Sequence, residues 1–134
     1  MKTVLVFGTF DILHPGHIHF LRQAKRHGDF LIVSIARSKI AEKIKGRGIL
    51  HSEEDRKRLL QSLKFVDKVV LGSRKDYLSH IVQLRPDVIV LGYDQKVFTQ
   101  GLREKLAKRG LKSKIVRAKG YKPRYYKSSK LLGG

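Results

Sequence analysis

The chain of 134 residues has no cysteine, tryptophan or asparagine, and acidic residues are scarce. Without cysteine it cannot form a disulfide, use a thiolate as a nucleophile or bind a metal through sulfur. Its apolar runs stay well short of the roughly 18 residues that a membrane-spanning helix needs. The first residues lack the basic-then-apolar pattern of a signal peptide. We therefore expect a soluble, cytoplasmic domain with no membrane partner, stabilised by its hydrophobic core.

The scarcity of acids leaves a large positive charge: 30 Lys and Arg residues against 11 Asp and Glu residues give a net charge of +19. Such an excess favours binding to polyanions, including nucleotides and nucleic acid. A heat-adapted surface is the alternative explanation, because the chain is rich in lysine and has a single methionine. The basic residues are spread along the whole chain, so charge alone does not identify a partner.

Short runs rich in valine, isoleucine and leucine alternate with amphipathic segments. Continuous apolar character is typical of strands covered on both faces of a parallel sheet. The expected strands are residues 3–7, 30–36, 66–71, 88–91 and 114–116, and the expected helices include residues 17–26, 52–64 and 102–108. The alternation predicts the α/β class, as a single doubly wound (Rossmann-like) domain over residues 1–134 with a five-stranded parallel sheet and helices on both faces.

Two basic, glycine-containing regions fit no regular element and are expected to be connections. Residues 41–51 contain Lys43 and Lys45, and residues 118–127 contain Arg124 and three tyrosines. Loops of this composition are candidates for closing over a bound phosphate. An ordinary solvated loop is the alternative for each of them.

The stretch GTFDILHPGH, residues 8–17, sets two histidines around Pro-Gly directly after the first apolar run. If that run is a strand, a helix starts near Gly16 and directs its free N–H groups toward the carboxyl edge of the sheet, where ligands bind. His14 then precedes the helix and His17 lies in its first turn, so both imidazoles can face one phosphate. A single histidine near a turn is more often structural, but this pair at a strand-to-helix switch indicates phosphate chemistry.

The same stretch resembles the HxGH motif of the nucleotidylyltransferase superfamily, in particular its cytidylyltransferase-like family. KIKGRGILHSEEDRKRLL is similar to the family's lysine-bearing loop and following helix, RPDVIVLGYDQ to its fourth strand, and YKSSKLL to its closing segment. LGYDQK resembles the archaeal-type FAD synthase branch. Glycerol-3-phosphate cytidylyltransferases typically carry Gly-Asp-Asp-Trp there, and this chain has no tryptophan.

The resemblance implies transfer of a nucleoside monophosphate from a nucleoside triphosphate to a phosphate-bearing acceptor, with release of pyrophosphate. FMN and ATP giving FAD is the favoured reaction, although the choice between ATP and CTP stays open. A CTP:glycerol-3-phosphate or related phospho-alcohol cytidylyltransferase is the alternative. A basic RNA-binding module is a more distant one, since no RNA-recognition motif is present and the histidines would stay unexplained. The family also implies a homodimer and magnesium bound mainly through the triphosphate.

The resemblance further assigns roles to individual residues. By the match to HxGH, His14 and His17 donate hydrogen bonds to triphosphate oxygens, neither acts as a covalent nucleophile, and Lys45 completes the catalytic set. Asp11 orients its loop or helps to hold magnesium. The expected nucleotide-binding residues are Gly8, Thr9, Phe10, Asp11, His14, His17, Lys43, Lys45, Gly92, Tyr93, Asp94, Gln95, Ser128 and Ser129.

Two arginines are expected to bind the acceptor or another anion. Arg56 follows the lysine-bearing loop, and Arg124 lies in the closing segment. That segment departs from the commonest family pattern, an arginine followed closely by Gly-Ile-Ser-Thr. Which of Lys122, Arg124 and Lys127 replaces the family's arginine is therefore open.

Overall fold

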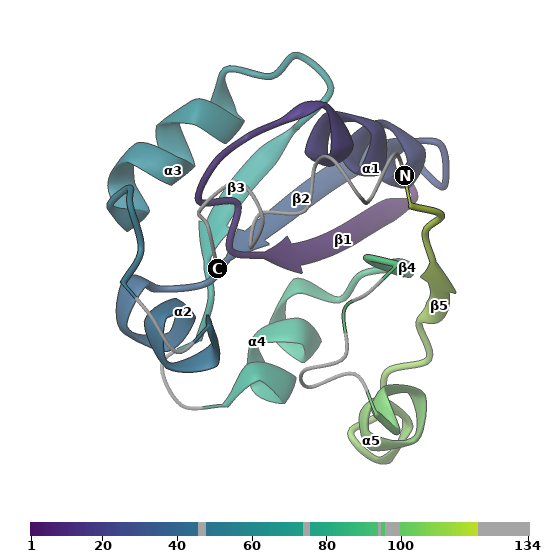
Figure 1. Ribbon diagram of the computed structural model, residues 1–134. Helices are drawn as coiled ribbons and strands as arrows, with labels where there is room; N and C mark the ends of the chain where they lie inside the picture. The colour runs from purple at the N-terminus through teal and green to yellow at the C-terminus, as the bar shows by residue number, and fades with distance from the viewer. Residues whose placement is uncertain (46–47, 74–75, 94, 96–99, 121–134) are drawn as a thin grey trace.

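A computed structural model of the chain describes residues 1–45, 48–73, 76–93, 95 and 100–120. Its strands form one all-parallel sheet in the order β3-β2-β1-β4-β5 (Figure 1). The strands are β1 (Thr3–Gly8), β2 (Phe30–Ile35), β3 (Lys68–Leu71), β4 (Val88–Leu91) and β5 (Lys114–Arg117). The chain builds the sheet outward from β1 in one direction and then crosses back to β4. The carboxyl ends of β1 and β4 are therefore the switch point where ligands of such sheets bind.

Helices cover both faces of this sheet. They are α1 (Pro15–Lys25), α2 (Ser38–Lys45), α3 (Glu53–Gln61), α4 (Tyr77–Leu84) and α5 (Leu102–Lys108). One core cluster joins Val4 and Val6 of β1 to residues of α1 and α3, and a second joins Leu5 to residues of α4 and α5. Successive strand residues point to opposite faces, so the unbroken apolar run of β1 supplies both cores. The predicted fold class is confirmed.

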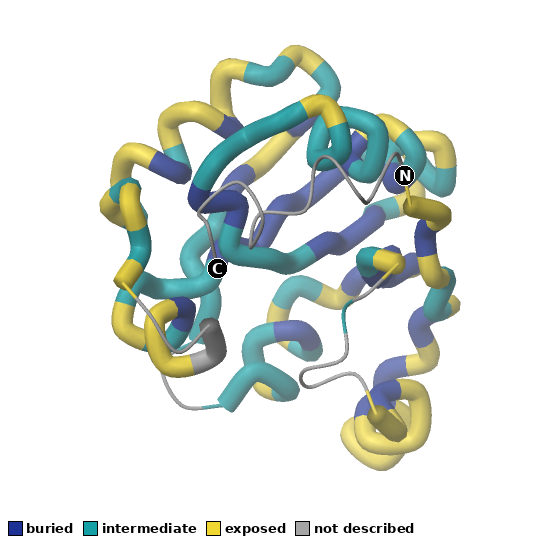
Figure 2. The backbone as a smooth tube through the Cα atoms, in the orientation of Figure 1, coloured by how far each residue is buried: buried dark blue, intermediate teal, exposed yellow. Residues whose placement is uncertain are grey.

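The distribution of buried residues agrees with a sheet that is covered on both faces. Figure 2 shows buried backbone along the central strands and exposed positions on α3 and α5. No helix in the described part of the chain is long and apolar enough to cross a membrane.

The expectation that residues 41–51 form only a connection is wrong for its first part. Residues 38–45 form α2, and Ala41 is fully buried within it. The Ser38 N–H at its first turn donates to Glu53 Oε1 at 3.0 Å, so a carboxylate from α3 satisfies one free donor of this helix. The glycines that indicated a connection, at positions 46 and 48, come after this helix in the sequence.

Candidate active site

The first helix after β1 begins as the motif predicts, with His14 as its N-cap and Pro15 in its first turn. The Gly16 N–H donates to His14 Nδ1 at 3.1 Å. Burial lowers the pKa of His14 below its ordinary value, so the ring is neutral at pH 7. Because Nδ1 is an acceptor here, the proton of the neutral ring lies on Nε2. His14 therefore holds an N–H donor at the positive end of α1.

The two motif histidines are stacked on each other, with ring centroids 3.8 Å apart and planes 22° apart. Phe10 meets the edge of His17 with a centroid distance of 5.2 Å. Phe10 is buried and has a positive φ of 52°, and a Cβ on Gly8 would come within 3.0 Å of its ring. Gly8 is therefore needed for Phe10 to close against the loop and support His17. The structure brings the predicted pair together at the switch point.

Asp11 holds the segment that precedes α3. Its two carboxylate oxygens accept the backbone N–H groups of Leu50 and His51, each at 2.7 Å, and it is 1% exposed. This geometry fits the loop-orienting role expected for Asp11 and does not fit a metal ligand, because both oxygens are engaged and buried. The described residues also contain no cluster of three or more His, Asp or Glu side chains that could hold a metal ion.

Arg56 is fully buried and directs its guanidinium at the protein itself. Its Nη1 donates to the carbonyls of Thr9 at 2.9 Å and Ala36 at 2.7 Å, its Nη2 to Ser38 Oγ at 3.2 Å and its Nε to the His51 carbonyl at 3.3 Å. These contacts join the ends of β1 and β2 to the starts of α2 and α3. Anion binding by Arg56 stays a prediction, and the geometry favours a structural clamp.

On the other side of the switch point, the turn after β4 brings together three of the four residues expected there. Gly92 and Gln95 close the turn through a backbone hydrogen bond of 3.1 Å, and Tyr93 between them is 40% exposed. The Tyr93 ring lies so close to Gly120 that an added Cβ there would be 3.2 Å from its Cγ. Arg117, which the sequence did not single out, donates to two carbonyls of the same turn.

The remaining expected residues are only partly placed. Lys43 is exposed on α2. The side chain of Lys45 lies outside the described residues, as do the whole of Asp94, the closing segment from residue 121 onward and all the site residues expected in it, Arg124, Ser128 and Ser129.

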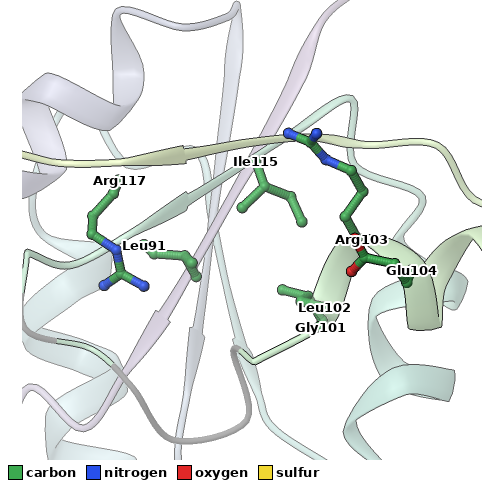
Figure 3. Close-up of a pocket in the computed structure, with 7 residues that line it drawn as sticks. All are labelled: Leu91, Gly101, Leu102, Arg103, Glu104, Ile115 and Arg117. Carbon is green, nitrogen blue, oxygen red and sulfur yellow. The ribbon is translucent and has the colours of Figure 1, made fainter.

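A pocket of about 350 Å³ lies between α5 and the ends of β4 and β5 (Figure 3). Leu91, Leu102 and Ile115 give it apolar walls, while Arg103 and Arg117 supply positive charge. All three apolar residues pack with the α4–α5 cluster, and the motif helix α1 covers the opposite face of the sheet. The pocket is therefore separate from the histidine pair.

Comparisons with known proteins identify the family and support the fold. The family model described as cytidylyltransferase-like matches residues 5–132. A FAD synthase of Ferroglobus placidus is 49% identical over 87% of this chain and 76% of its own length, and one of Aciduliprofundum boonei is 46% identical over 90% and 80%. A crystal structure titled as a lipopolysaccharide core biosynthesis protein of Thermoplasma volcanium is 40% identical, with a TM-score of 0.85, over 90% of this chain and 98% of that one.

Stacked histidines at a helix start, on the carboxyl edge of a doubly wound sheet, lie where such folds bind the phosphates of nucleotides. Together with the match over nearly the whole sequence, they assign the chain to a family. It belongs to the cytidylyltransferase-like family.

Proposed function

We propose that this protein is an FMN adenylyltransferase, which joins FMN and ATP to give FAD and pyrophosphate. The observation that carries the proposal is the stacked His14–His17 pair at the start of α1, in a chain nearly half identical to proteins named FAD synthase. The family supplies the type of reaction, and these relatives supply the choice of FMN and ATP.

In the proposed reaction, a phosphate oxygen of FMN attacks the α-phosphorus of ATP. The bond from that phosphorus to the bridging oxygen breaks, and its electron pair leaves with pyrophosphate. Negative charge grows on the phosphate oxygens, so catalysis requires preorganised donors and positioning. The Nε2–H of His14, the imidazole of His17 and the positive end of α1 supply these donors. No covalent bond to the protein is needed.

The other expected basic and hydroxyl residues bind the remaining phosphates of the two substrates in this proposal. Lys43 and Lys45 neutralise phosphate oxygens, and Ser128 and Ser129 receive the β- and γ-phosphates. Arg124 binds the acceptor phosphate. Because Asp11 does not fit a metal ligand, we propose that magnesium enters with ATP through the triphosphate oxygens. From the family resemblance, we also propose that two copies of the chain form a homodimer.

A matrix of substrates tests the proposed function. The four nucleoside triphosphates, supplied as their magnesium salts, are combined one by one with FMN, glycerol 3-phosphate, phosphocholine, phosphoethanolamine and phosphopantetheine. Pyrophosphate release and the product mass are measured for each pair. We expect the FMN and ATP pair to give FAD at the highest rate. Formation of CDP-glycerol from CTP and glycerol 3-phosphate, with no flavin product from any triphosphate, would replace the proposal by the cytidylyltransferase alternative.

A further inference from the structure

A side chain joins β1 to β4 where their main-chain ladder has ended. Both strands continue beyond their last registered pair, Leu5 with Ile89. Past that point the Gln95 carboxamide bonds to both sides: its Nε2 donates to the Phe7 carbonyl at 2.9 Å, and its Oε1 accepts from the Gly92 N–H at 3.1 Å. The amide therefore takes the place of a main-chain link at the switch point.

A second long-range contact holds the same turn from β5. Arg117, which is registered opposite Leu91, donates from Nη1 to the carbonyls of Gly92 and Gln95, both at 2.7 Å. Figure 3 shows its side chain on the β5 side of the pocket, beside Leu91. Gly92 is thus held at its N–H by Gln95 and at its carbonyl by Arg117. Hydrogen bonds from a charged donor are stronger than neutral ones, so the turn is fixed from two strands at once.

Resting on the proposed function, we propose that Gln95 and Arg117 are positioning residues that set the affinity of the site for the nucleoside triphosphate. Gln95 is expected to line the nucleotide side of the site, and that assignment stays a prediction. Its carboxamide bonds to the backbone beyond the ends of both β1 and β4, and Arg117 bonds to the backbone of the turn.

The proposal assigns nucleotide affinity to the turn after β4 and the chemical step to the donors at the start of α1. The turn that Gln95 and Arg117 hold carries the exposed Tyr93 at the switch point, whereas the catalytic donors lie on α1. Loosening the turn adds an ordering cost to nucleotide binding and leaves the donors of His14 and His17 in place. Such a change raises KM and the dissociation constant together, with kcat little altered.

Two substitutions remove the contacts and keep an unbranched side chain at each position. Gln95→Met keeps the length and loses both hydrogen bonds, and Arg117→Met loses both carbonyl contacts. We expect each to raise the dissociation constant of an ATP analogue with a methylene between the α- and β-phosphorus about tenfold, measured by calorimetry, because each loses two hydrogen bonds that order the turn. KM for ATP should rise by a similar factor, and kcat should change less than about threefold.

Matched controls separate this effect from loss of charge or general substitution. Arg103→Met removes the same charge from the same pocket, and Gln61→Met makes the same change at an exposed position of α3. Both should bind the analogue within about twofold of the unsubstituted protein. Arg117→Lys, which keeps a donor within reach of the turn, should lose less affinity than Arg117→Met.

Unchanged affinity in a folded Arg117→Met protein would overturn the proposal, as would a loss equal to that of Arg103→Met. A fall in kcat at constant KM would overturn it too, because the turn would then act on the chemistry. If Gln95→Met does not fold, the affinities of the two Arg117 variants are enough to test the proposal. A protein that binds the analogue but makes no FAD refutes the proposed function and leaves this inference testable by affinity. One that binds no nucleotide refutes both.

Discussion

The two sides of the switch point, after β1 and after β4, are built in different ways. On the β1 side, neighbouring residues place the histidine pair: His14 caps its own helix, Pro15 starts that helix, and Phe10 packs on Gly8 and His17, while Asp11 and Arg56 tie the adjoining loop to distant segments. On the β4 side, the turn is held by contacts between distant segments, such as Gln95 with Phe7, 88 positions away. A sequence motif can therefore specify the local geometry after one strand, while the geometry after the other strand depends on how the strands assemble.

Substituting the two motif histidines should give the largest loss of activity. We expect His14→Ala and His17→Ala each to lower kcat for FAD formation at least about a hundredfold, because each removes a donor aimed at transition-state charge. Circular dichroism should show an intact fold. His27→Ala, at a half-buried position on the turn after α1, is the control and should keep normal turnover. Near-normal turnover in either motif variant would remove that histidine from the mechanism.

Removing the hydrogen bonds of Arg56 should lower the stability of the fold more than it lowers the reaction rate. Arg56→Met leaves three carbonyls without their buried donor, so we expect the free energy of unfolding to fall by about 2 kcal/mol. Urea unfolding measures this, with the exposed Arg58→Met on the same helix as control. If stability is unchanged and only the KM for the acceptor rises, Arg56 binds the anion as the sequence predicted.

The smallest expected effect is a pH dependence of stability. Burial lowers the pKa of His80, with a further contribution from Arg37, and Ser34 Oγ lies 2.9 Å from its Nε2. Because the folded pKa lies below the unfolded value of about 6.5, the unfolded chain takes up the proton first as the pH falls. The free energy of unfolding should therefore be lower at pH 5.5 than at pH 7.5.

A single substitution tests how much of this pH dependence comes from His80. His80→Gln can keep the hydrogen bond to Ser34 and cannot titrate, so its stability should vary less with pH over the same range. His14, whose pKa is also lowered by burial, contributes to the slope in the same direction. An identical pH profile for both proteins would show that His80 does not contribute.

Much of the fold could be predicted because continuous apolar runs mark the strands of a parallel sheet. Residues 88–91 were placed without error, and the expected helix over residues 102–108 matches α5. The helix α2 was missed although Ile40, Ala41 and Ile44 recur at helical spacing, because the glycines at positions 46 and 48 suggested a connection. The bond from the Ser38 N–H to Glu53, 15 positions later, could not be predicted from the local sequence.

The site was predictable where the motif acts on its neighbours and not where distant groups meet. The positions of His14 and His17 at the helix start follow from the Pro-Gly between them. The family resemblance assigns Arg56 to an anion and Gln95 to the nucleotide, and both assignments stay predictions. In the structure both side chains bond to backbone atoms. Residue type identifies the available hydrogen bonds, but only the assembled strands determine which partners are in reach.

The central claim is that the protein moves the adenylyl group of ATP directly onto FMN. ATP labelled with ³²P at the α- or the γ-phosphorus, incubated as its magnesium salt with FMN, tests it. The account predicts that the α-label appears in FAD, that the γ-label appears in pyrophosphate, and that denatured protein from an incubation without FMN carries no label. An α-label that stays in AMP or ADP, or that becomes attached to the protein, would contradict direct adenylyl transfer.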